Sequence, residues 1–174
     1  MGTVNYYTSN YITLGIKLYD RLDLEKDSEF MEEIQESAKE DDISIDDVIE
    51  QYIADLYEDD YSNIEYELKK HQFNYFHVSI EPGYYEGFTI NIENNHSIAF
   101  DDYEEKREAQ KEITELKQFL VDCAGLGLVA CYPGWCTGYQ DYKGTLAAIR
   151  EAIHEMREEV KKTPTWRQYE REAA

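Results

Sequence analysis

The sequence predicts an α+β fold, with an antiparallel or mixed sheet of four to five strands and helices packed on one face of it. Two patterns lead to this class. Apolar residues alternate with a period of two in some segments, as in half-buried strands, and recur every three to four residues in others, as in amphipathic helices. No internal repeat or low-complexity linker divides the 174 residues, so we expect a single domain over 1–174, with residues 20–70 as a candidate acidic helical insertion.

The first elements are a strand and a helix. Residues 3–18 are β-prone, and the apolar side chains of residues 12–18 alternate on one face, which predicts a half-buried strand. Residues 30–38 then place apolar side chains at helical spacing. Asp27 or Ser28 is the expected N-cap of this helix, because a short polar side chain there satisfies the first free N–H groups.

Two capping signals follow. Ser44, with Asp47 three residues later, resembles a capping box and opens a second helix. Ser62 and Glu65 repeat the pattern, so we expect a separate short helix from there to about Lys70. A lysine in the last turn suits the negative end of the helix dipole.

The middle of the chain predicts a hairpin. Apolar side chains alternate over residues 76–80 and again over residues 88–92, and a turn through Pro82-Gly83 joins the two runs. Residues 97–100 are a candidate for a further strand.

The C-terminal part predicts two helices with a strand between them. The first is capped by Asp101 or Asp102 and carries apolar residues at steps of three and four. Residues 126–132 form a short apolar run that suits a buried strand. The last helix must end before Pro164, because the residue preceding a proline is driven out of the helical region. Trp166 is expected to pack the tail onto the rest of the chain.

The charge is high and unevenly placed. The chain has 38 Asp and Glu against 17 Lys and Arg, a net charge of -21, and a pI near 4.4. Residues 20–70 hold 20 acidic and 5 basic side chains, a net -15. This sign disfavours direct binding of nucleic acid, and no run of 18 apolar residues predicts a membrane span. The start has no signal-peptide pattern, so we expect a cytoplasmic protein.

The acidic helices carry the main candidate site. Residues three or four apart on a helix lie about 5–6 Å apart at Cβ. Successive phosphates of a DNA strand rise about 3.4 Å along the axis and also advance around it, so the distance between them is larger than this rise. Carboxylates at helical spacing can therefore take roughly the places of phosphates in a cleft lined with Lys and Arg. The candidate partner-binding residues are Glu29, Glu32, Glu33, Glu36, Glu40, Asp46, Asp47, Glu50, Asp55, Tyr57, Glu58, Asp59, Asp60 and Tyr61. The alternative is that these acids only form solvated helix faces.

Other chemistry has weaker support. His77 on the hairpin, with Glu81, could act as a general acid/base pair, although a surface imidazole on a solvated strand is the favoured explanation of His77. The acidic run that starts at Asp23 lacks the Gly and Glu positions of a calcium loop. The string from Cys131 to Cys136 has no metal-ligand spacing and suits a tight turn above a buried Trp. We expect neither a metal nor a cofactor.

The acidic block, with its interleaved tyrosines, reads DSEFMEEIQESAKEDDISIDDVIEQYIADLYEDDY. In composition over roughly residues 20–103, in length and in its lack of catalytic motifs, the chain resembles small acidic phage and mobile-element anti-defence proteins. These include anti-CRISPR and anti-restriction proteins that mimic DNA. The resemblance carries over no individual residue.

The resemblance implies an inhibitor, in the cytoplasm of a bacterial host cell, of a basic nucleic-acid-binding protein such as a Cas effector or a restriction enzyme. Two alternatives stay open. One is a small hydrolase or nuclease that uses His77 and Glu81. The other is a non-catalytic accessory protein, which could form a homodimer through its nearly neutral C-terminal third.

Overall fold

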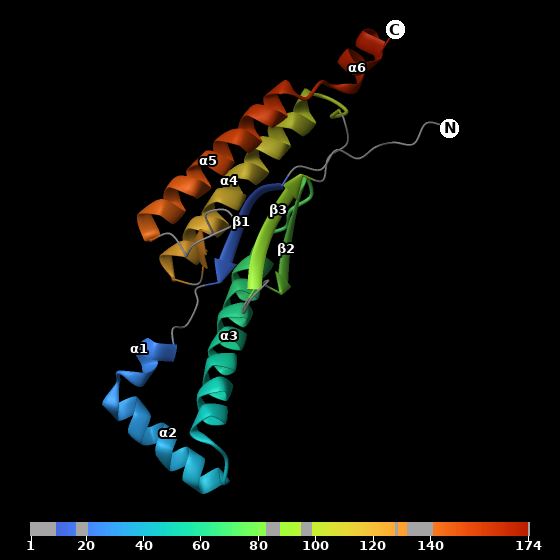
Figure 1. Ribbon diagram of the computed structural model, residues 1–174. Helices are drawn as coiled ribbons and strands as arrows, with labels where there is room; N and C mark the ends of the chain where they lie inside the picture. Colours follow the sequence, from blue (N-terminus) through green and yellow to red (C-terminus); the bar gives the residue numbers. More distant parts are fainter. Residues whose placement is uncertain are drawn as a thin grey trace.

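The computed structural model describes residues 10–16, 21–82, 88–94, 99–127, 129–131 and 141–173. These residues form an α+β fold, which confirms the predicted class (Figure 1). The elements in chain order are β1 (Asn10–Ile16), α1 (Arg21–Glu25), α2 (Ser28–Asp41), α3 (Ile45–Lys69), β2 (Phe76–Pro82), β3 (Phe88–Asn94), α4 (Tyr103–Gly125), β4 (Val129–Cys131), α5 (Tyr142–Lys162) and α6 (Trp166–Ala173).

The sheet is smaller than predicted. Its strand order is β2-β3-β1-β4, and all neighbours are antiparallel. Three seven-residue strands form the sheet proper, whereas β4 adds only three residues beside β1. The expectation of four to five strands is wrong because two candidate segments contribute little. Leu126 caps the end of α4, and Phe100 forms only an isolated bridge with Thr165.

The helices α4 and α5 lie side by side along the sheet (Figure 1). Their apolar stripes meet the apolar side chains of the strands in one continuous core. The largest fully buried side chains of this core are Ile64, Phe76, Ile90, Ile92, Phe100, Ile113, Leu116, Phe119 and Leu120. Burial of this apolar area is the main stabilising term of the fold.

A β-bulge modifies the alternation in β1. The register of β1 against β3 shifts between Asn10 and Ile12. As a result Tyr11 also lies on the core side, where its ring meets that of Phe76 with 6.0 Å between centroids. Its hydroxyl donates to Glu159 of α5, so a polar contact ties the sheet to that helix. A bulge places two successive side chains on one face, which a strict period of two does not predict.

Most predicted helix boundaries are confirmed. Asp27, rather than Ser28, is the N-cap of α2, and its carboxylate accepts hydrogen bonds from two backbone N–H groups. Ser44 caps α3 and Asp102 caps α4. The helix α5 ends at Lys162, before Pro164, as the proline requires.

The predicted break at Ser62 is wrong. The helix α3 continues without interruption, and Ser62 lies exposed in its interior. The segment contains no Gly or Pro, and Ile53, Tyr57, Ile64 and Leu68 keep one face of the helix against the core on both sides of Ser62. Continuous packing therefore overrides a local capping signal.

The sequence did not predict α6. Its start is fixed by backbone hydrogen bonds: the Phe100 N–H donates to Pro164 at 3.0 Å, and the Trp166 N–H donates to Phe100 at 2.7 Å. These bonds tie the start of α6 to Phe100. The half-buried ring of Trp166 contacts that of Tyr169 within α6, with 5.6 Å between centroids, and its packing onto the rest of the chain stays a prediction.

Some expectations lie outside the described residues: the turn after Pro82, the segments 3–9 and 17–18 of the β-prone N-terminal run, and the string from 132 to Cys136. Within the described part of the chain, no helix has the length and apolarity needed to cross a membrane. Its His, Cys, Asp and Glu side chains form no group of three that could hold a metal ion.

An acidic helical arm as the candidate functional site

The candidate site lies mainly on a part of the molecule that extends away from the sheet. Figure 1 shows α1, α2 and the first half of α3 reaching from the end of the sheet that is remote from α6. We call residues 21–52 the arm and the other described residues the body. The arm has 13 acidic and 3 basic side chains, so its net charge is -10.

A small apolar nucleus of its own holds the arm together. Ile34 and Ala38 of α2 and Ile49 of α3 are buried, but they are separate from the core cluster of the body. The rings of Phe30 and Tyr52 pack beside them, with 4.9 Å between centroids. These contacts fix α2 against the start of α3.

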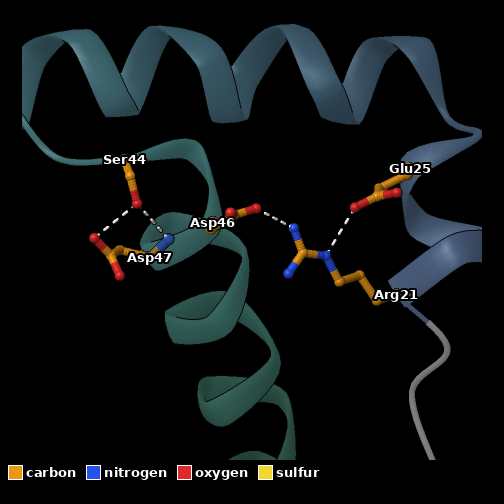
Figure 2. Close-up of polar contacts among 5 residues, drawn as sticks. All are labelled: Arg21, Glu25, Ser44, Asp46 and Asp47. Atoms are coloured by element: carbon orange, nitrogen blue, oxygen red, sulfur yellow. Dashed lines mark hydrogen bonds and ion pairs between the residues drawn. The ribbon is translucent and has the colours of Figure 1, made fainter.

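Polar contacts connect α1 to the start of α3 (Figure 2). The Arg21 guanidinium donates to Glu25 at 2.7 Å and also to Asp46. These two hydrogen bonds raise the pKa of Arg21 further above its usual value. At the N-terminus of α3, the Asp47 N–H donates to the Ser44 hydroxyl at 3.1 Å, and this hydroxyl donates to the Asp47 carboxylate at 2.7 Å. Asp46 and Asp47 therefore make structural hydrogen bonds within the arm, although both side chains stay exposed.

The predicted glutamates of α2 form one exposed stripe: Glu29, Glu32, Glu33, Glu36 and Glu40. At about 100° per residue, this stripe lies opposite Ile34 and Ala38, the residues that pack towards α3. From Glu29 to Glu40 it spans about 16 Å. No basic side chain of the described residues forms an ion pair with any of these five glutamates.

A second set of acids lies on α3. Asp55, Glu58 and Asp59 share its outward side, and all three are exposed. Asp55 accepts a hydrogen bond from Gln51 at 3.0 Å. Glu50 is also exposed but lies about 130° around the helix from this outward side.

The tyrosine predictions need correction. Tyr57 is 7% exposed and belongs to the core of the body, so its side chain is unavailable to a partner. The reason is its helical spacing from Ile53 and Ile64, which face the same core. Asp60 and Tyr61 are half-buried, and a hydrogen bond with Glu65 raises the pKa of Tyr61.

The exposed acids of α2 and of α3 therefore form two separate stripes. The packed side of α2 faces α3, so the glutamate stripe of α2 faces away from α3. The stripe of Asp55, Glu58 and Asp59 lies on the outward side of α3, beyond the arm. The sequence predicted which residues carry the charge, but the angle between the two helices decides how it is displayed.

The candidate acid/base pair on the hairpin, His77 and Glu81, is widely separated along β2. His77 and Glu81 are four residues apart on β2, which separates their Cα atoms by about 13 Å. This distance excludes a direct proton transfer between them. Glu81 instead accepts from Asn91 at 3.3 Å, and the residue directly opposite His77 is Glu93. Only the register of the hairpin could have shown this pairing.

Burial raises the pKa of the Cys123 thiol to about 12, so this cysteine is not a nucleophile near neutral pH. The expected pairing of two chains through the C-terminal third stays a prediction, since the structure describes a single chain.

Comparison of the chain with protein-family models, with curated proteins and with solved structures gives no match.

Proposed function

We propose that this protein inhibits a host nucleic-acid-targeting defence enzyme, of the anti-CRISPR or anti-restriction kind, by presenting carboxylates in place of nucleic-acid phosphates. The partner is a basic nucleic-acid-binding protein, such as a Cas effector or a restriction enzyme. The observation that supports the proposal is the exposed glutamate stripe of α2 on an arm that reaches away from the body.

The electrostatics favour binding by an array of charges. A single exposed ion pair contributes only about 0–1 kcal/mol, because water and salt screen it. Five carboxylates along about 16 Å of helix act together on a cleft lined with cations. The net charge of -10 on the arm would also steer the two proteins together, and this steering weakens as salt shortens the screening length.

Capture from a bacterial lysate tests the proposal. The lysate should contain an active CRISPR effector and a restriction enzyme. The protein is immobilised through its C-terminus, which lies at the end of the molecule away from the arm (Figure 1). Bound proteins are eluted in salt steps or with DNA and RNA, and identified by mass spectrometry. We expect one basic nucleic-acid enzyme that salt or nucleic acid releases.

Two matched triple variants separate the arm from overall charge. Glu33→Lys, Glu36→Lys and Glu40→Lys reverse the stripe near the C-terminal half of α2, where lysine suits the helix dipole. Glu151→Lys, Glu155→Lys and Glu172→Lys make the same change of charge at exposed positions of the body. Loss of capture with the first variant alone supports the proposal. Equal capture by both variants, or no basic enzyme captured by the unmodified protein, overturns it.

A further inference from the structure

The tip of the arm exposes two isoleucines. Ile43 lies in the turn between α2 and α3 and is 46% exposed, and Ile45 is the first residue of α3 and is 40% exposed. Among the described residues, only two other aliphatic side chains of this size are exposed, Leu22 and Leu126. Leu22 and Leu126 lie apart from each other, whereas Ile43 and Ile45 lie together at the end of the arm that is most remote from the core (Figure 1).

The turn that carries these isoleucines is fixed on both sides. Asp42 adopts a left-handed conformation with φ 54° and closes α2. The Ile43 N–H donates to the Ala38 carbonyl at 3.1 Å, as in a Schellman motif, and Ser44 caps α3. A turn held in this way loses little conformational entropy when it binds a partner.

Local structure explains only one of the two exposed side chains. Ile43 takes the position from which a side chain contacts the last turn of the preceding helix and the fourth residue of the next one. Its partial exposure is then a by-product of capping. Ile45, at the first helical position, has no such role in a cap, so it is the more informative residue.

The isoleucines border a shallow hollow of about 480 Å³. It is lined by Gln35, Ala38, Lys39, Asp42, Ile43 and Ile45. Residues 39–47 around it hold five acidic side chains and one lysine, a net -4. An apolar centre within a charged rim is the arrangement found at energetic hot spots of protein interfaces.

We infer that this tip is the anchor of the interface, and that Ile43 and Ile45 contact an aromatic or aliphatic platform in a cation-lined cleft that binds single-stranded nucleic acid. Such clefts combine cations that bind the backbone with aromatic side chains on which bases stack. The acids of the arm would meet the cations, and the isoleucines would occupy the place of a stacked base. The inference rests on the proposed function and specifies the kind of cleft.

Two synthetic peptides provide a probe of this chemistry. One alternates four lysines with three tryptophans, and the other has glycine in place of each tryptophan, so the charge is the same. Each is titrated into the full-length protein, and binding is followed by NMR of the isoleucine methyl groups. We expect the tryptophan peptide to bind about tenfold more tightly and to shift the methyl signals of Ile43 and Ile45.

Two variants test whether the tip causes the tighter binding of the tryptophan peptide. Ile45→Ser should remove most of the advantage of the tryptophan peptide, whereas Leu126→Ser, a similar exposed side chain in the body, should retain it. Equal binding of both peptides, or an advantage that survives Ile45→Ser, overturns the inference. If both peptides bind equally and the triple lysine variant of α2 weakens both, the proposed function stands while the inference fails. If neither peptide binds, both the proposed function and the inference are contradicted.

Discussion

The arm and the body are stabilised in different ways. The body has a continuous core of large apolar side chains from six elements of the sheet and helices, whereas the arm has three buried apolar residues and one pair of aromatic rings. The arm nevertheless carries a net -10 of the total -21. The excess charge is thus placed on helices that need little packing, where its self-repulsion does not strain the main core.

Even a buried acid in the body has a structural partner. Glu112 of α4 is 7% exposed and accepts hydrogen bonds from the backbone N–H groups of Tyr75 and Phe76, at 2.9 and 3.1 Å. It therefore caps the start of β2. The glutamates of the α2 stripe have no ion-pair partner among the described residues.

The largest effect is expected in the body. Phe76→Ala removes a fully buried ring that packs in the sheet, and it should lower the free energy of unfolding by roughly 3–5 kcal/mol. Denaturant unfolding followed by circular dichroism measures this change. A loss below about 1 kcal/mol would mean that the ring is not part of a packed core.

The next effect concerns the buried carboxylate. Glu112→Ala leaves the half-buried N–H of Tyr75 and the buried N–H of Phe76, at the start of β2, without this acceptor, and should cost about 2–3 kcal/mol. Glu108→Ala, which removes only an exposed hydrogen bond to the Tyr75 hydroxyl, is the control and should cost less than about 1 kcal/mol. Similar losses for both variants would contradict the capping role of Glu112.

A cavity created in the arm should destabilise the arm without destabilising the body. Ile49→Ala removes the most buried side chain of the arm, with an expected cost of about 2 kcal/mol, at the low end for such changes, because exposed helices can collapse around it. Hydrogen exchange should show loss of protection in α2 with little change in α4 and α5. Loss of protection throughout the chain would show that the arm and the body unfold as one unit.

A titration separates a packed tyrosine of the body from the exposed ones. Burial, and then a hydrogen bond to Glu108, raises the pKa of Tyr75 to about 12. The unfolded chain loses this proton near pH 10, so the stability from the neutral phenol is complete below pH 10 and is lost as the pH rises to about 12. Absorbance at 295 nm should show a phenol titration near pH 12 that is lost in Tyr75→Phe.

The smallest effect is that of salt. Because the glutamates of α2 repel one another at helical spacing, added salt should slow hydrogen exchange in α2 slightly and leave α4 unchanged. Repetition with the triple lysine variant of α2 should abolish this dependence. A salt effect of equal size in α4 would remove the distinction between arm and body.

Sequence patterns predicted the local parts of this structure better than its assembly. Caps such as Ser44 and Asp102 act within one turn of helix, so their positions could be predicted. The continuity of α3 through Ser62 and the burial of Tyr57 depend on packing against distant residues. For the site, the acidic residues were predictable, whereas their division into two stripes depends on the angle between α2 and α3.

The exposed isoleucines of the tip had no signal in the sequence, because an apolar residue next to a cap is expected to be buried. The role of Glu112 was hidden in the same way: it stands between the apolar positions of α4, and only the sheet beside it supplies the N–H groups that it binds.

A competition measurement tests whether the arm takes the place of nucleic acid on its partner. A nucleic-acid enzyme captured by the arm is loaded with fluorescent DNA or RNA, and the protein is titrated in while anisotropy reports release. We predict complete release at about one copy of the protein per enzyme, and none with Glu33→Lys, Glu36→Lys and Glu40→Lys combined. Retention of the nucleic acid at saturation, or equal release by the triple variant, would contradict the account.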